Sequence, residues 1–185
     1  AETRARLLER LGLVTLEPTA ILDLGGGTGA GVRELQKRYP EATVVNLDWA
    51  PAMLRLAPGQ NRVCANAQQL PFADASFDLV TANLSLPGCD LPENVFAEAQ
   101  RVLRSPGLLL FNTLGPDTLK EVRKAWAGVD PRPRVHDFVD MHNVGDALVQ
   151  AGFREPVMDV DKLTITYQAI DRLLADLRSL AATHR

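Results

Sequence analysis

The chain has 185 residues, of which 46% are hydrophobic, so it is long enough for one domain with a single hydrophobic core. Its formal net charge of −3 gives no global basic field, which argues against nucleic acid as a partner. No apolar run is long enough to span a bilayer, and no signal-peptide pattern opens the chain. The two cysteines, Cys64 and Cys89, lack metal-ligand spacing and are expected to be reduced thiols. We therefore expect a cytoplasmic protein without membrane contact.

The first half of the chain alternates short apolar runs with amphipathic stretches. After a charged, helix-like start, the apolar runs predict five strands, at "AILDLG", "ATVVNLD", "NRVCANA", "FDLVTANLSL" and "GLLLFNT". Helical spacing lies between them, in "TGAGVRELQKRY", "PAMLRLA" and "DLPENVFAEAQRVLR", where Asp90 and Glu93 have capping-box spacing. This alternation predicts an α/β fold of the Rossmann-like kind, an open and mostly parallel sheet with helices on both faces.

After Thr113 the alternation stops. The chain continues with a predicted helix in "GPDTLKEVRKAWAG", a proline- and charge-rich loop in "VDPRPRVHDFVD", and a helix in "MHNVGDALVQAG" that ends at Gly152. An extended, β-rich segment, "EPVMDVDKLTITY", and an amphipathic helix, "AIDRLLADLRSLAA", follow. We expect a single domain over residues 1–185, in which residues 114–152 form an inserted segment on the ligand side of the sheet.

Glycines cluster directly after the first predicted strand, and Asp23 precedes them. A dinucleotide fingerprint, with an acid about 20 residues later, is matched only loosely by Gly25, Gly27, Ala30 and Asp48. Asp23 would repel a pyrophosphate and attract a cation. S-adenosylmethionine carries an ammonium, a sulfonium and a ribose, so we favour it over a nicotinamide or flavin ligand. The alternative for Asp23 is a carboxylate that only ties down the turn.

Three segments, "ILDLGGGTG", "NLDWAPAML" and "NAQQLPFADASFDLV", resemble motifs of the class I S-adenosylmethionine-dependent methyltransferases. The resemblance implies that the glycine turn faces the methionine end, that the acid of the second motif takes the ribose hydroxyls, and that the residues after it surround the adenine. The family has aspartate where Asn66 stands, but an amide oxygen still accepts from the adenine amino group. Met53 has core packing as its alternative role. The cofactor-binding residues expected in the crevice are Asp23, Gly25, Gly26, Gly27, Gly29, Asp48, Trp49, Met53, Asn66, Ala67, Asn83 and Leu84.

The second half is similar to the malonyl-acyl-carrier-protein O-methyltransferases of biotin synthesis, in "FNTLGPDTLKEVRKAW", "RVHDFVDMHNVGDALVQAGF", "PVMDVDKLTITY" and "LRSLAATHR". The likeness runs over nearly the whole chain. It implies esterification of the free malonyl carboxylate, with S-adenosylhomocysteine as the other product. A carboxylate is already ionised at neutral pH, so we expect no catalytic base, and catalysis then depends on alignment.

Carrier proteins of this type are acidic, and basic residues of the inserted segment would receive one. We expect Arg123 or Arg134 near the malonyl carboxylate, His136 as a further donor, and a monomeric enzyme. The segment "HDFVDMH" also has the composition of an iron site. However, Asp140 is a natural helix N-cap there, so we expect no metal. The basic residues in question are Lys120, Arg123, Lys124, Arg132 and Arg134.

Three departures from this family are visible in the sequence. The family has a tyrosine-bearing lid helix at the start and a tryptophan shortly after Leu84. It also has a strand that comes last in the chain but lies between the fifth and sixth strands in the sheet. None of the three is recognised in this sequence. Two rival functions therefore stay open. One is a hydroxylase like the related assembly factors of mitochondrial complex I, and the other is a non-catalytic module that binds S-adenosylmethionine.

Overall fold

The computed structural model describes residues 2–86, 92–129 and 137–179, and the chain divides into two compact units. Residues 1–113 and 146–154 form the first unit, and residues 114–145 and 155–185 form the second. The sequence predicted one domain over residues 1–185 with an inserted segment at residues 114–152. The division into two compact units does not test this prediction.

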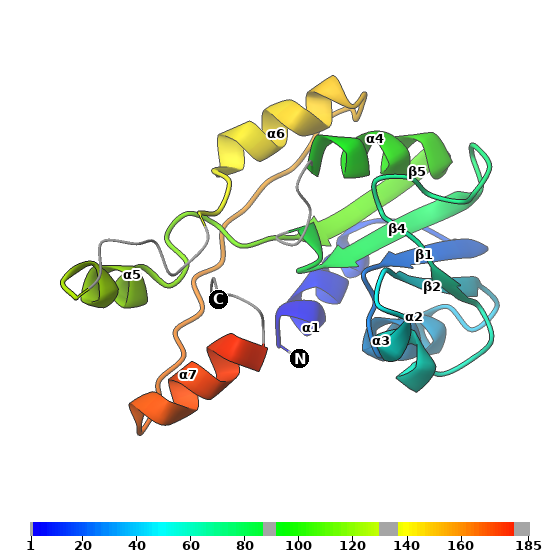
Figure 1. Cartoon of the computed structure of the whole chain (residues 1–185). Coiled ribbons are helices and arrows are strands. Elements are labelled where there is room, and N and C mark those ends of the chain that lie inside the picture. Colours follow the sequence, from blue (N-terminus) through cyan, green and yellow to red (C-terminus); the bar gives the residue numbers. More distant parts are fainter. Residues whose placement is uncertain (1, 87–91, 130–136, 180–185) are drawn as a thin grey trace. The chain divides into compact units, whose positions relative to one another are not determined.

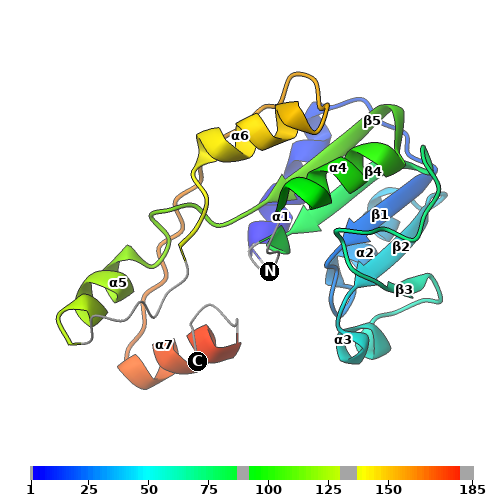
Figure 2. The same ribbon diagram turned by 45° about the horizontal axis from the view of Figure 1, so that its top comes forward.

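A five-stranded sheet forms the centre of the first unit (Figure 1). Its order is β3-β2-β1-β4-β5, and every neighbouring pair is parallel, so the predicted Rossmann-like α/β fold is confirmed. The chain moves outward from β1 on one side and then crosses to β4 on the other, so the order reverses between β1 and β4, which lie side by side in Figure 2. The strands are β1 (Ala20–Leu24), β2 (Thr43–Asp48), β3 (Arg62–Cys64), β4 (Phe77–Asn83) and β5 (Leu103–Asn112).

All the helices predicted from the sequence are present, with shorter bounds. Pro51 occupies the first turn of its helix, where a missing N–H costs nothing. The predicted N-cap is confirmed, since the Asp140 Oδ1 accepts from the His142 backbone N–H at 2.9 Å, whereas Asp90 lies outside the described residues. The helices are α1 (Glu2–Glu9), the 3-10 helix η1 (Arg10–Leu13), α2 (Ala30–Arg38), α3 (Pro51–Leu56), α4 (Pro92–Val102), α5 (Lys120–Ala127), α6 (Met141–Gln150) and α7 (Ile170–Ser179).

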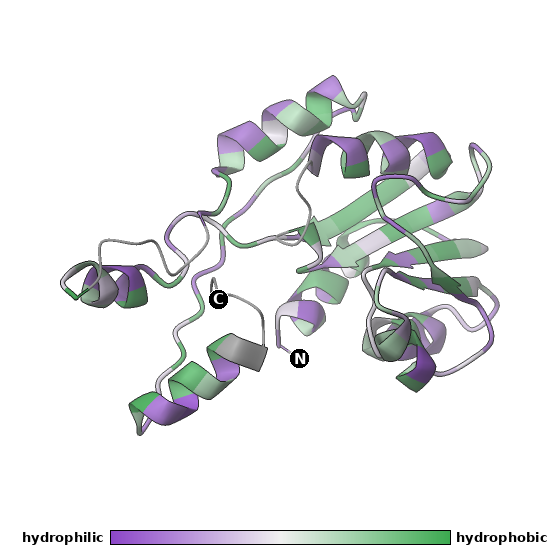
Figure 3. Cartoon of the chain, in the orientation of Figure 1, coloured by the Kyte–Doolittle hydropathy of each residue, from purple (hydrophilic) through white to green (hydrophobic). Residues whose placement is uncertain are grey.

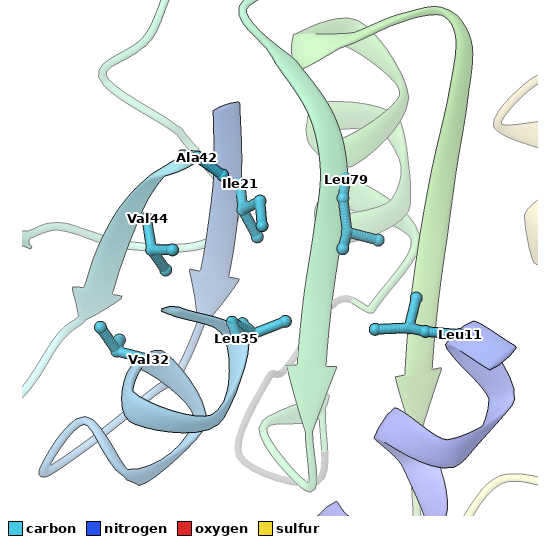
Figure 4. Packing of buried hydrophobic residues seen from close by; sticks show 7 residues of the cluster. All are labelled: Leu11, Ile21, Val32, Leu35, Ala42, Val44 and Leu79. Atoms are coloured by element: carbon cyan, nitrogen blue, oxygen red, sulfur yellow. The ribbon is translucent and has the colours of Figure 1, made fainter. Parts of the chain in front are cut away.

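The strands of the sheet consist largely of hydrophobic residues, as their green colour in Figure 3 shows, and both faces of the sheet are packed. On one face, Ile21 and Leu79 pack with Leu35 of α2 and Leu11 of η1, and all four are at most 1% exposed (Figure 4). On the other face, α4 buries its apolar stripe, in which the Phe96 ring lies 5.3 Å from the ring of Phe111 in β5, centroid to centroid. Burial on two sides explains why the strands read as continuous apolar runs rather than alternating ones.

The segment predicted to be extended and β-rich forms no strand. Residues 155–167 have no hydrogen-bonded strand partner among the residues that the structure describes, and Val157 and Ile165 are 95% and 72% exposed. A β-branched sequence favours an extended backbone, but a strand needs a neighbour with which to form a ladder. Within the described ranges, no helix has the length and apolar character that crossing a membrane requires.

Candidate functional site

The carboxyl ends of the parallel strands bring several of the expected residues to one edge of the sheet. The glycine turn follows β1, Asp48 ends β2, and Asn83 ends β4. In register, Asp23 pairs with Asn46 of β2 and with Thr81 of β4, so it lies at the point where the strand order reverses. Open α/β sheets bind ligands at such points.

Glycine is required in the turn at two positions. Gly25 has φ +64°, and a Cβ there would lie 2.3 Å from the Cβ of Ser85. Gly29 has φ +74°, and a Cβ there would lie 2.6 Å from the Cδ of Pro58. The turn is also tied to β2, since the N–H groups of Gly25 and Gly26 donate to the Leu47 carbonyl at 2.8 and 3.2 Å. The backbone therefore has a fixed path directly after β1.

The backbone N–H and the carbonyl of Gly27 both form hydrogen bonds with side chains of β2. Its N–H donates to Asp48 Oδ2 at 2.9 Å, and its carbonyl accepts from Asn46 Nδ2 at 3.2 Å. Asp48 Oδ1 accepts from the Ala50 N–H at 2.8 Å. Each carboxylate oxygen can still accept a further hydrogen bond. Asn46 was not predicted from the sequence, although a polar residue inside an apolar run, two positions before Asp48 and so on the same face, is a readable signal.

The Asp23 carboxylate is buried and only half satisfied. It is 4% exposed, its Oδ1 accepts from the Thr81 hydroxyl at 2.9 Å, and its Oδ2 has no partner. Burial raises the pKa of Asp23 to about 6, while the Thr81 hydrogen bond and the charge of Arg4 oppose that rise. A buried acceptor without a partner costs free energy, so a donor or a cation at this position would stabilise the site.

A cavity of about 40 Å³ opens beside this carboxylate. It is lined by Asp23 and the glycine turn and, from α1, by Arg4, Leu7 and Leu8. Arg4 donates to Glu34 Oε1 from Nη2 at 2.8 Å and from Nε at 3.0 Å. The sequence did not predict a role for α1, because nothing in a charged helix that ends well before β1 points to the glycine turn.

The residues expected around the adenine are exposed or partly exposed. Trp49 is 81% exposed and Met53 is 48% exposed, so packing in the core, the alternative for Met53, does not account for either side chain. Asn66 is exposed and forms a local turn, because its Oδ1 accepts from the Gln68 N–H at 2.9 Å. Its oxygen retains one acceptor position, as the adenine contact requires. Ala67 is half-buried next to it.

Asn112, at the end of β5, organises the end of β4. Its Oδ1 accepts from the Leu84 N–H at 2.9 Å, and its Nδ2 donates to Asn83 Oδ1 at 3.1 Å. The same Nδ2 donates to the Thr3 carbonyl at 3.1 Å, which ties α1 to the sheet. Leu84 has φ +54°, a conformation that costs free energy for a leucine, and these bonds hold it there.

Of the expected substrate residues, only Arg123 lies in the described part of the chain. Its Nη2 donates to the Pro116 and Thr118 carbonyls, both at 2.6 Å, and its Nη1 lies 3.5 Å from Asp137 Oδ1. Arg134 and His136 lie outside the described residues. Within residues 2–86, 92–129 and 137–179, no three His, Cys, Asp or Glu side chains are grouped to hold a metal ion.

The chain is similar to known methyltransferases. Residues 22–111 match the family model described as "Methyltransferase domain". A malonyl-[acyl-carrier protein] O-methyltransferase of Laribacter hongkongensis is 47% identical over 96% of this chain and 65% of that protein. A protein of the same name from Gallionella capsiferriformans is 46% identical over 98% of this chain and 67% of its own length. The chain thus spans about two thirds of the length of these curated relatives.

Solved structures agree on the fold. A crystal structure of an S-adenosylmethionine-dependent methyltransferase from Thermotoga maritima superposes with a TM-score of 0.64 at 22% identity, over 82% of this chain and 72% of that one. The phosphoethanolamine N-methyltransferase 2 of Haemonchus contortus, in complex with S-adenosyl-L-methionine, gives a TM-score of 0.65 at 21% identity, over 82% of this chain and 36% of that one.

Proposed function

Because the chain belongs to the family of the malonyl-[acyl-carrier protein] O-methyltransferases, we propose that it transfers a methyl group from S-adenosylmethionine to the free carboxylate of malonyl-acyl-carrier protein, in biotin synthesis. The observation that carries this proposal is the buried Asp23 carboxylate, which lines the cavity at the glycine turn and has one oxygen without a partner. An anionic acceptor at this place suits a ligand with an ammonium and a sulfonium, and disfavours a pyrophosphate.

The residues at this edge of the sheet fit the parts of such a cofactor. Asp23 and Arg4 border the same cavity and complement a zwitterionic amino-acid end, the first through its carboxylate and the second through its guanidinium. Asp48 has acceptor capacity left for ribose hydroxyls. Trp49 and Met53 present apolar surface to an adenine, while Asn66 and Ala67 offer an acceptor and a donor to its edge. Gly25, Gly26, Gly27, Gly29, Asn83 and Leu84 complete the proposed cofactor site.

The amino-acid end needs more room than the cavity has. A volume of about 40 Å³ accommodates only a few water molecules. The Arg4 side chain lines the cavity from α1 and is paired with Glu34. We therefore propose that Arg4 leaves Glu34 and pairs with the cofactor carboxylate when the cofactor binds.

No general base is needed for the reaction. The cofactor supplies an electrophilic methyl group on its sulfonium, and the malonyl carboxylate is ionised at neutral pH. The chain contributes alignment and exclusion of water from the site. The malonyl carboxylate would be held by Arg123 or Arg134, with His136 as a further donor, and the other basic residues of segment 114–152 would contact an acidic carrier protein. We also propose a monomer that acts in the cytoplasm, where the exposed thiol of Cys64 would remain reduced.

One assay tests the activity directly. The protein is incubated with methyl-labelled S-adenosylmethionine and malonyl-acyl-carrier protein, and the expected product is a labelled ester that mild alkali releases. Acetyl-acyl-carrier protein, which lacks the free carboxylate, serves as the control and should remain unlabelled. Binding of the cofactor without any labelled ester would contradict the proposed reaction and would favour a non-catalytic binding module. Failure to bind the cofactor would contradict the proposed site as well.

A further inference from the structure

The loop between β3 and β4 is anchored to α4 by two charged side chains. This loop, residues 65–76, contains the Asn66 turn and has no regular secondary structure. Within it, the Asn66 carbonyl accepts from the Gln69 N–H at 3.0 Å, and Leu70, the next residue, is only 4% exposed. Such an irregular segment needs partners for its backbone groups, and α4 provides them.

Glu98 and Arg101 form hydrogen bonds with the backbone N–H and the carbonyl of Leu70. Glu98 Oε2 accepts from the Leu70 N–H at 2.6 Å, and Arg101 Nη2 donates to the Leu70 carbonyl at 3.0 Å. Arg101 Nη1 donates to the Phe72 carbonyl and to Asp74 Oδ1, both at 2.8 Å. One guanidinium therefore fixes three points of the loop.

The two side chains also orient each other. Arg101 donates to Glu98 through Nε and through Nη2, each at 2.8 Å, so the pair is bidentate. Arg101 hydrogen bonds hold the pKa of Glu98 below its usual range, with the Leu70 N–H adding to the effect. Because α4 buries Val95, Phe96 and Ala99 against the sheet, the pair projects from a rigid support.

We propose that Glu98 and Arg101 are positioning residues for recognition of the adenine base. The inference rests on the proposed function, in which Asn66 and Ala67 read the adenine edge. The Gln68 N–H fixes the Asn66 side chain, and the anchored Leu70 lies two residues further along the chain. The pair of Glu98 and Arg101, which we call the clamp, therefore sets the direction in which Asn66 Oδ1 and the Ala67 N–H point. Neither Glu98 nor Arg101 touches the base.

The chain contains a matched control for a merely structural role. Arg104, three residues after Arg101, donates to Asp78 Oδ1 at 2.8 Å and to the Ala75 carbonyl at 3.1 Å. Like Arg101, it is partly exposed, with 41% of its side chain accessible against 31% for Arg101. However, Asp78 lies at the start of β4, at the sheet edge opposite the glycine turn, and Ala75 lies at the β4 end of the loop, nine residues after Asn66.

The experiment compares binding of S-adenosylhomocysteine and S-inosylhomocysteine by calorimetry. Hypoxanthine reverses the donor and acceptor pattern of the adenine edge, so the wild type should prefer the adenine compound by roughly tenfold. Arg101→Lys removes the planar fork and keeps the charge, and Glu98→Gln weakens the same clamp. Both variants should reduce the preference to about twofold or threefold, whereas Arg104→Lys should retain the wild-type preference even if it loses comparable thermal stability.

The outcomes separate the two proposals. If the wild type binds neither compound, the proposed cofactor site is wrong. If it binds both compounds equally well, the site stands and the positioning role is overturned. The positioning role is also overturned if both Arg101→Lys and Glu98→Gln keep the full preference, or if Arg104→Lys loses as much of it. Should Arg101→Lys fail to fold, Glu98→Gln alone decides the question.

Discussion

Asp23 is the residue whose environment most affects what the proposed site can bind. Burial raises the pKa of its carboxyl group to about 6, from an ordinary value of 3.8. The folded protein therefore holds this proton more tightly than the unfolded chain does. It gains stability from Asp23 at pH values below 3.8 and loses that stability as pH rises through 6. A cationic ligand needs the ionised form, so ligand binding and protonation compete at this carboxylate.

The competition predicts a pH-dependent affinity for S-adenosylhomocysteine, whose ammonium stays protonated between pH 5 and 7. With a pKa of about 6, lowering the pH from 7 to 5 should weaken binding about tenfold, as calorimetry can measure. Thr81→Val removes the hydrogen bond that opposes the rise in pKa, so its affinity should begin to fall at a higher pH. Asp23→Asn should bind weakly at every pH, and an unchanged pH dependence in that variant would disprove the assignment.

At the scale of the elements, Asp78 joins β1, β4 and β5 at the edge of the sheet opposite the glycine turn. Its Oδ2 accepts from the Thr19 N–H at 2.8 Å and from the Ala20 N–H at 3.0 Å, and its Oδ1 accepts from Arg104 at 2.8 Å. Despite an opposing effect of burial, these bonds lower the pKa of Asp78 to about 2. Its ionised form is thus worth on the order of 2 kcal/mol of stability at neutral pH.

Asp78→Asn should therefore reduce the free energy of unfolding at pH 7 by about 1–3 kcal/mol, measured by urea denaturation. The stability that the Asp78 carboxylate provides is fully present above pH 3.8 and is lost as pH falls through 2, so wild type and variant should converge in acid. Asp74→Asn is the control, because 79% of that side chain is exposed and its loss should cost little. A difference between wild type and Asp78→Asn that is as large at pH 2 as at pH 7 would contradict this account.

The elements also show what the sequence could and could not predict. β1, β2 and β4 were predictable because a strand buried on both faces reads as an unbroken apolar run. The expected acids, Asp23 and Asp48, lie at the ends of such runs. Arg4 was not predictable, because its place beside Asp23 depends on how α1 packs against the sheet. The segment at residues 155–167 was expected to be β-rich and forms no strand. The pattern of apolar residues in a sequence indicates which side chains share a face, but it does not indicate whether a neighbouring strand is available for pairing.

At the scale of the whole molecule, the proposed roles divide between the two units. The residues proposed to hold the cofactor, with the clamp on α4, belong to the first unit, and the residues proposed to hold the malonyl carboxylate belong to the second. The second unit also contains the exposed segment at residues 155–167, in which Val157, Val160 and Ile165 are 95%, 66% and 72% accessible. An extended backbone with β-branched side chains and no strand partner among the described residues can pair with another chain.

The proposed monomer refers to the low protein concentration of an enzyme assay. At the much higher concentrations used for light scattering, we predict that this segment drives self-association of the chain. Val157→Glu with Ile165→Glu changes the formal net charge from −3 to −5 and removes little buried apolar area. Association measured by light scattering should therefore fall, while the free energy of unfolding should stay within about 0.5 kcal/mol. Ile21→Glu, at a position that is 0% exposed, should instead abolish folding. Unchanged association would contradict the prediction. A stability loss above about 1 kcal/mol would show that Val157 and Ile165 are packed against other side chains, because an exposed residue contributes little to folding.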